Sequence, residues 1–152
     1  MLPTPKKFKM VAAAAEGSLK LTAFDNALLK AGIGNVNLVR VSSILPPTAE
    51  QDQDLVLPPG SLVPTAYGSI VCDEPGTRIA AAVGIGFSED TFGVIMEFSG
   101  VCDRKAAEEK IAAMLRDAFA NRGMRLASTE ILAVDHVVED TACAFAAVAL
   151  WY

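Results

Sequence analysis

Two adjacent serines, Ser42 and Ser43, stand at the end of a β-branched segment. Ile44 follows them, and Pro46 and Pro47 come shortly after. A pair of serines at the end of a strand is most often an ordinary turn. Chemistry at this pair would need a pinned or strained peptide bond, and the flanking prolines are suited to pinning it because their rings fix φ. Taken alone, the pair does not distinguish a turn from a reactive site.

A second candidate is Glu97, the charged residue of an otherwise apolar strand segment, VIMEF. Because side chains alternate along a strand, Glu97 shares a face with Ile95 and lies opposite Met96. Its carboxylate either lies on a solvated sheet face, which is the commoner situation, or is partly buried with a raised pKa. In the second case Glu97 is a candidate general acid.

The remaining polar candidates carry weaker signals. Asp25 lies beside Phe24 in a segment with helical periodicity, where an exposed carboxylate is the usual finding. Asn37 alternates with apolar neighbours in a strand and needs hydrogen-bond partners if it is buried. His136, the single histidine, receives no role. The pattern Gly-x-Gly at residues 84–86 lacks a third glycine and a following helix, so it is not a dinucleotide fingerprint.

The composition is that of one apolar domain. A chain of 152 residues fits a single domain, and its hydrophobic content of 52% indicates that some apolar surface is buried between subunits. A net charge of −5 argues against nucleic acid and anionic membranes as partners. The charge is uneven, with +4 on residues 1–42 and −9 on residues 43–152, so the two segments attract each other even if the chain is cut between them.

The cysteine and apolar patterns favour a cytoplasmic protein. Cys72, Cys102 and Cys143 have no CxxC spacing and are interpreted as reduced, mostly buried thiols; with one histidine they offer no credible zinc site. No apolar stretch reaches the roughly 18 residues that a membrane span needs. The apolar run at residues 10–15 is also shorter than the core of a secretory signal.

Hydrophobic periodicity predicts the order β-α-β-loop-β-β-β-α-β-β. The predicted strands are residues 8–14, 35–44, 62–72, 77–87, 92–98, 129–138 and 142–151, and the predicted helices are 22–31 and 103–121. These elements suit two stacked sheets, each covered outside by a helix. Residues 45–60, with four prolines, form the one long irregular segment, which is therefore functional or flexible.

Both predicted helices have an apolar face and a terminal signal. In the first, the face comprises Leu21, Phe24, Leu28 and Ala31, and Gly32 stands where a C-terminal glycine belongs. In the second, Asp103 is the predicted N-cap and Gly123 ends the helix; its face comprises Ala107, Ile111, Met114, Leu115 and Ala118.

Four segments together resemble the pyruvoyl-dependent arginine decarboxylases. They are AFDNALLKAGIGNVNLVRVSSILPP at residues 23–47, LVPTAYG at 62–68, VIMEF at 94–98 and CAFAAVALWY at 143–152. The resemblance spans most of the chain from about residue 20. It implies an α+β fold, a four-layer αββα sandwich formed by a single domain of residues 1–152. It also implies a homotrimer with active sites between neighbouring subunits.

The resemblance further implies a proenzyme that cuts itself between Ser42 and Ser43, giving chains 1–42 and 43–152. The Ser43 hydroxyl attacks the preceding carbonyl, which turns the amide into an ester. β-Elimination frees the Ser42 carboxylate and leaves dehydroalanine, which hydrolyses to a pyruvoyl group and ammonia. This covalently bound group is the implied cofactor, with no metal and no pyridoxal phosphate. Its carbonyl forms a Schiff base with the substrate and accepts electrons as the carboxylate leaves.

Three other residues match positions with a role in the family. Glu97 matches the proton donor, and Asn37 matches the residue that supports processing and the active site. Asp25 matches the carboxylate that receives the substrate's guanidinium, a group well suited to a two-oxygen acceptor. The implied reaction converts L-arginine to agmatine and CO₂.

Two alternatives stay open on the sequence. One is a pyruvoyl decarboxylase for another amino acid, such as histidine or ornithine, which would keep Ser43 and Glu97 but need a different pocket. The other is a non-catalytic trimeric homologue that is never processed. Asp25 discriminates the first, and a denaturing gel discriminates the second, since an unprocessed chain gives one band.

Overall fold

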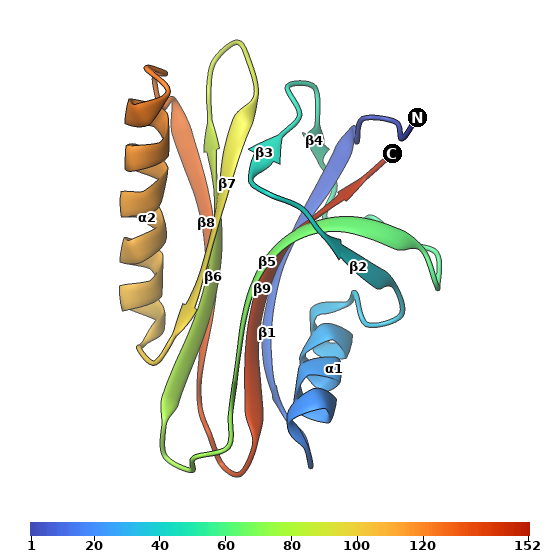
Figure 1. The fold of residues 1–152 in the computed structure, drawn as a ribbon, viewed down its shortest axis with the longest axis vertical. Helices are drawn as coiled ribbons and strands as arrows, with labels where there is room; N and C mark the ends of the chain where they lie inside the picture. Colours follow the sequence, from blue (N-terminus) through green and yellow to red (C-terminus); the bar gives the residue numbers. More distant parts are fainter.

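Two β-sheets stacked face to face, with one helix on the outer face of each, make up the structure (Figure 1). The computed structural model describes residues 1–152. The sequence-based prediction of a four-layer αββα sandwich is confirmed. No helix combines the length and the apolarity that a bilayer crossing requires.

The first sheet has five strands in the order β2-β5-β9-β1-β4. Their bounds are β1 Lys7–Glu16, β2 Asn37–Arg40, β4 Glu50–Gln51, β5 Leu62–Cys72 and β9 Ala142–Trp151. The strand β9 is central and antiparallel to both β1 and β5. Helix α1, Lys20–Ala31, covers the outer face, where the ring of Phe24 meets that of Phe145 edge-on at 5.9 Å.

The second sheet has four strands in the order β3-β7-β6-β8. Their bounds are β3 Ile44–Leu45, β6 Arg78–Phe87, β7 Gly93–Gly100 and β8 Ser128–Val137. Helix α2, Arg104–Asn121, packs against β6, β7 and β8. The two glycines of β6 make room for it: a Cβ on Gly84 would collide with Ile111, and one on Gly86 would lie 2.5 Å from Phe119. The Gly-x-Gly pattern therefore serves helix packing.

The largest core cluster lies between the two sheets. It takes its side chains from the facing strands, chiefly β1 and β9 on one side and β6 and β7 on the other. Its fully buried members include Ala66, Ile79, Val83, Ile85, Ile95 and Val148. A second cluster beneath α1 and a third beneath α2 complete the layers. Burial of this apolar area is the main force that holds the sheets together.

The predicted elements are confirmed except at three places. The segment 45–60, predicted to be irregular throughout, contains the short strand β4, which pairs with β1. The segment 35–44 is not one strand: β2 belongs to the five-stranded sheet, β3 belongs to the four-stranded sheet, and residues 41–43 cross between them. In α1 the predicted face is also rotated, because Leu21 is 76% exposed while Ala23 and Ala27 are fully buried. The small alanines let the helix approach the sheet closely. The predicted N-cap Asp103 is confirmed, since its side chain accepts a hydrogen bond from Ala106 N.

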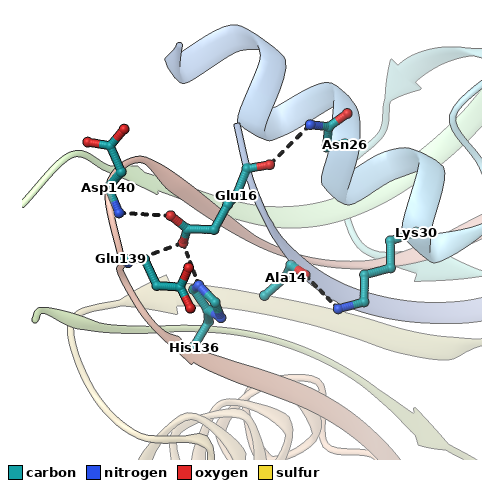
Figure 2. Close-up of polar contacts among 7 residues, drawn as sticks. All are labelled: Ala14, Glu16, Asn26, Lys30, His136, Glu139 and Asp140. Atoms are coloured by element: carbon teal, nitrogen blue, oxygen red, sulfur yellow. Dashed lines mark hydrogen bonds and ion pairs between the residues drawn. The ribbon is translucent and has the colours of Figure 1, made fainter. Parts of the chain in front are cut away.

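A polar clamp joins the layers at one end of the molecule (Figure 2). The carboxylate of Glu16, at the end of β1, accepts hydrogen bonds from the backbone N–H of Asp140 at 2.8 Å and of Glu139 at 3.3 Å. It also accepts one from Nε2 of His136 on β8, in the opposite sheet. The amide of Asn26 on α1 donates to the Glu16 carbonyl oxygen. One residue thus links α1, β1, β8 and the turn before β9.

This clamp makes stability depend on pH. Burial acts to raise the pKa of Glu16, but the hydrogen bonds from Asp140, His136 and Glu139 outweigh it and hold the pKa below its ordinary value. A carboxylate with a lowered folded-state pKa contributes stability above its ordinary pKa and loses it as the pH falls through the lowered one.

We expect Glu16→Gln to lower the free energy of unfolding by about 1.5–3 kcal/mol near neutral pH, the range of a hydrogen bond to a charged group. The difference from the parent should shrink as the pH falls below the ordinary value of 4.5. Urea denaturation at a series of pH values and one protein concentration measures it. The control is Glu74→Gln, an exposed carboxylate of the β5–β6 turn. A loss of unfolding free energy in Glu16→Gln that does not change with pH would contradict this role of the Glu16 carboxylate.

Candidate functional site

The serine pair lies where the chain passes from one sheet to the other. On its N-terminal side, the N–H of Val41 donates to the carbonyl oxygen of Thr65 on β5 at 3.1 Å. On its C-terminal side, the carbonyl oxygen of Ser43 accepts from the N–H of Ile95 on β7 at 2.7 Å. The Ser42 carbonyl and the Ser43 N–H have no backbone hydrogen-bond partner. Hydrogen bonds therefore hold the backbone on both sides of the peptide bond between the serines. The carbonyl and N–H groups of that bond itself have no backbone partner.

The backbone here is pinned without an unusual conformation. No peptide bond is cis, and no residue other than glycine has a positive φ. The fixation comes from the two sheets themselves, because β2 is hydrogen-bonded to β5 and β3 to β7.

An apolar groove of about 270 Å³ borders the serine pair. Prolines from three segments line it, together with the end of β9 and the N-terminal residues. Its lining residues are Leu2, Pro3, Pro5, Val41, Ser42, Ile44, Pro46, Pro64, Leu150 and Tyr152. Apolar side chains therefore lie beside the serine pair, although Ser42 itself is exposed and Ser43 is half-buried.

Glu97 points between the sheets, next to the serine pair along β7. It pairs with Val83 on β6, just as Ile95 pairs with Ile85, so it shares their inward face. Since Ile95 N binds Ser43 O, Glu97 is the next residue on this face, roughly 7 Å further along the strand. Its Oε2 is buried and has no hydrogen-bond partner.

The setting of Glu97 changes its acidity. Burial raises the pKa of Glu97, and the positive charge of Arg40 offsets part of this rise. Of the two interpretations that the sequence left open, the structure therefore supports the partly buried carboxyl. A carboxylic acid that stays protonated to higher pH can give up a proton where an exposed one has already lost it.

Arg40 and Tyr67 belong to the same neighbourhood, and the sequence analysis did not single them out. The Nη2 atom of Arg40 donates to the Tyr67 carbonyl oxygen at 2.7 Å, and the guanidinium carbon lies 4.4 Å from the centre of the Tyr67 ring. A signal was present in the sequence: Arg40 is the one charged residue in the β-branched segment before the serines.

Within a single subunit, Asn37 and Asp25 lie further from the serine pair. Asn37 begins β2, and its Nδ2 donates to the carbonyl oxygen of Gly60 at 3.0 Å, which ties β2 to the end of the long loop. Asp25 is exposed on α1 and forms neither a hydrogen bond nor an ion pair within the chain. The structure thus brings Ser43 and Glu97 to neighbouring strands, whereas Asp25 faces outward.

Comparison with known proteins agrees with these features. Residues 7–152 match the family model described as pyruvoyl-dependent arginine decarboxylase. A protein of that name from Methanocaldococcus jannaschii is 50% identical, over 97% of this chain and 91% of its own length. Proteins of the same name from Pyrococcus furiosus and Methanococcus maripaludis are 49% and 41% identical, over 97% of this chain and over 96% and 92% of their own lengths.

The buried carboxyl of Glu97 should weaken the fold at high pH. A carboxyl whose folded-state pKa is raised favours the protonated form, so it opposes folding once the pH exceeds the ordinary value of 4.5. We expect Glu97→Gln to unfold at a higher temperature than its parent at pH 8, by roughly 2–4 °C for each kcal/mol relieved. At pH 4 the two proteins should melt together.

Thermal denaturation of both proteins in a Ser43→Ala background checks this, because that background lacks the hydroxyl which the expected cut would need. Glu109→Gln, an exposed carboxylate on α2, is the matched control and should show no pH-dependent gain. Equal melting temperatures of the parent and Glu97→Gln at pH 8 would show that the ionised Glu97 carboxyl does not destabilise the fold.

Proposed function

The chain belongs to the pyruvoyl-dependent arginine decarboxylase family, and from this premise we propose that it converts L-arginine to agmatine and CO₂ with a covalently bound pyruvoyl group formed from Ser43. One observation carries the proposal furthest: the peptide bond before Ser43 is pinned between the two sheets, beside a buried carboxyl that favours its protonated form. The site thus contains the peptide bond from which the pyruvoyl group would form and, beside it, the carboxyl of Glu97 as a proton donor.

The Ser42–Ser43 bond has what self-cleavage needs. The Ser43 hydroxyl adds to the Ser42 carbonyl carbon, and the C–N bond breaks as the C–O bond of an ester forms. Elimination then releases the Ser42 carboxylate, and hydrolysis of the dehydroalanine yields the pyruvoyl group and ammonia. The hydrogen bonds at Val41 and Ser43 would favour this step because they limit the rotation of the backbone that carries the hydroxyl and the carbonyl.

Cleavage would leave the fold intact. The segment 1–42 contributes β1, α1 and β2, and β1 forms a ladder of ten residue pairs with β9. The segment 43–152 contributes every other strand and α2. The two chains therefore share a sheet and a core, and they stay associated without the peptide bond.

In the decarboxylation step, a pyruvoyl group at position 43 supplies the electrophilic carbonyl that accepts the electron pair left when CO₂ departs. Glu97 donates the proton to the carbon that loses the carboxylate, and its buried position keeps that proton available. Asn37 supports the site by fixing the start of β2 through Gly60.

Asp25 binds the guanidinium of arginine, as a carboxylate free of partners in its own chain is able to do. Because Asp25 faces outward, the proposal includes a homotrimer in which the active site lies between neighbouring subunits. Exposed apolar side chains beside the serine pair and on β5 support such contacts: Val39, Ile44 and Leu62 are 44%, 44% and 68% exposed. Three unpaired cysteines suit the reducing cytoplasm, which we propose as the location.

The first test concerns processing. Purified protein should separate on a denaturing gel into chains 1–42 and 43–152, and the larger should be blocked to N-terminal sequencing. Its mass should differ from that of the free-serine fragment by the loss of one ammonia. Ser43→Ala should stay as one band, because it lacks the attacking hydroxyl. A wild-type chain that remains intact after long incubation would point to the unprocessed homologue.

The second test concerns the substrate. We expect Asp25→Asn to be processed normally but to lose at least tenfold in kcat/KM on arginine, since a charge-assisted hydrogen bond contributes about 1.5–3 kcal/mol. CO₂ release from arginine, lysine, ornithine and histidine measures this. Asp90→Asn, an exposed carboxylate in the β6–β7 loop, is the control. A wild-type preference for another of the four, or full arginine activity in Asp25→Asn, would refute the assignment.

A further inference from the structure

Arg40 is held rigidly although its residue is exposed. Its Nη2 donates to the Tyr67 carbonyl oxygen at 2.7 Å, and its guanidinium stacks on the Tyr67 ring at 4.4 Å. That ring packs in turn against Phe145, 5.4 Å away and fully buried. Two contacts to an anchored tyrosine fix the position of the charge. No carboxylate lies within 4.0 Å to neutralise it, because none of the ion pairs includes Arg40.

The anchoring point lies where β5 passes β7 beside Glu97. Tyr67 precedes Gly68, and a Cβ on Gly68 would lie only 2.9 Å from the carbonyl oxygen of Phe98. Phe98 is the residue after Glu97. The absent side chain at Gly68 therefore allows the strand that carries the Arg40 anchor to touch the strand that carries the buried carboxyl.

The other charged groups around Glu97 are few. On β6 its partner is the apolar Val83, and on the inward face of β7 the neighbour is Ile95. From α2, Asp117 and Arg122 line a groove that Glu97 borders, and Arg122 donates to the Ala118 carbonyl oxygen. Among these groups, Arg40 is the one whose positive charge lowers the pKa of Glu97, against the larger opposite effect of burial.

We propose that Arg40 is a positioning residue for the proton donor: fixed on Tyr67 at the crossing of β5 and β7, its guanidinium supplies the positive charge that keeps Glu97 a usable acid. Its role in catalysis rests on the proposed function, whereas its action on Glu97 does not.

The physical reason lies in how burial and charge oppose each other. Burial alone would make Glu97 hold its proton too tightly, and a general acid works best when its pKa is near the operating pH. A cation nearby but not in an ion pair lowers the pKa without drawing the carboxylate into a fixed salt bridge. Arg40 also lies two residues before Ser42, so the segment that ends at the proposed cut carries the charge that tunes the acid.

The first experiment needs no activity. In the uncut Ser43→Ala background, the Glu97 carboxyl carbon is followed by ¹³C NMR against pH, with Glu97→Gln to assign the signal. We expect Arg40→Met to raise the pKa of Glu97 by about 0.5 pH unit or more, because the positive charge that lowers this pKa is lost. Arg40→Lys keeps the charge and should titrate near the parent. An unchanged titration in Arg40→Met would overturn the inference.

The second experiment uses the processed enzyme and its pH profile. Wild-type kcat should fall at high pH as Glu97 loses its proton, and this basic limb should move to higher pH in Arg40→Met but not in Arg40→Lys. Glu97→Gln should lose roughly 10²–10⁴-fold in turnover and show no such limb. A rise in KM for arginine with the limb unmoved would mean that Arg40 binds substrate instead.

The outcomes separate the two proposals. If wild type releases CO₂ from none of the amino acids but the NMR titration shifts, the proposed function fails while the action of Arg40 on Glu97 stands. If wild type decarboxylates arginine and neither the titration nor the limb moves, the role of Arg40 fails alone. Denaturation curves and the band pattern on a gel show that each variant is folded and processed.

Discussion

The structure depends on residues 41–43, the segment in which the chain passes from one sheet to the other. Val41 is hydrogen-bonded to β5, and Ser43 is hydrogen-bonded to β7. Either bond alone would leave the intervening peptide free to rotate. Together the two hydrogen bonds restrict the peptide bond between the serines, because the apolar core fixes how the two sheets stack. For the self-cleavage proposed above, burial of the core would matter through geometry, because it limits the movement of the backbone that carries the Ser43 hydroxyl and the Ser42 carbonyl.

The same core makes Glu97 both useful and destabilising. Apolar neighbours such as Ile95 and Val83 shield the Glu97 carboxyl from water, and its Oε2 atom has no hydrogen-bond partner in place of the water. Proteins generally avoid such groups, and those that remain are concentrated at functional sites. Arg40 moderates the effect from a distance, so that the site keeps a buried acid without a buried ion pair.

Much of this could be predicted from the sequence. Period-two patterns located the long strands, and Asp103 marked the start of α2. The alternation at Ile95, Met96 and Glu97 gave the correct face for the carboxyl. These features are local, because they depend on residues within one element. The role of the motif around Ser42 and Ser43 stays a prediction.

Other features are not local and escaped prediction. The segment 35–44 looks like one strand because β-branched residues recur along its whole length. It nevertheless divides between two sheets, and no local pattern encodes their separation. Leu21 was assigned to the buried face of its helix, whereas the sheet is approached through Ala23 and Ala27. The close approach of β5 and β7 at Gly68, on which the proposed role of Arg40 depends, is a contact between residues far apart in the chain.

The central place of β9 has a consequence for the order of events during synthesis. This strand follows all the other strands in sequence, yet it lies between β1 and β5 in the five-stranded sheet. Until β9 has been synthesised, β5 has no partner on that side of the sheet, so Thr65, which accepts the hydrogen bond from Val41, is held on one side only. The proposed self-cleavage would therefore be favoured only in a chain that already contains β9.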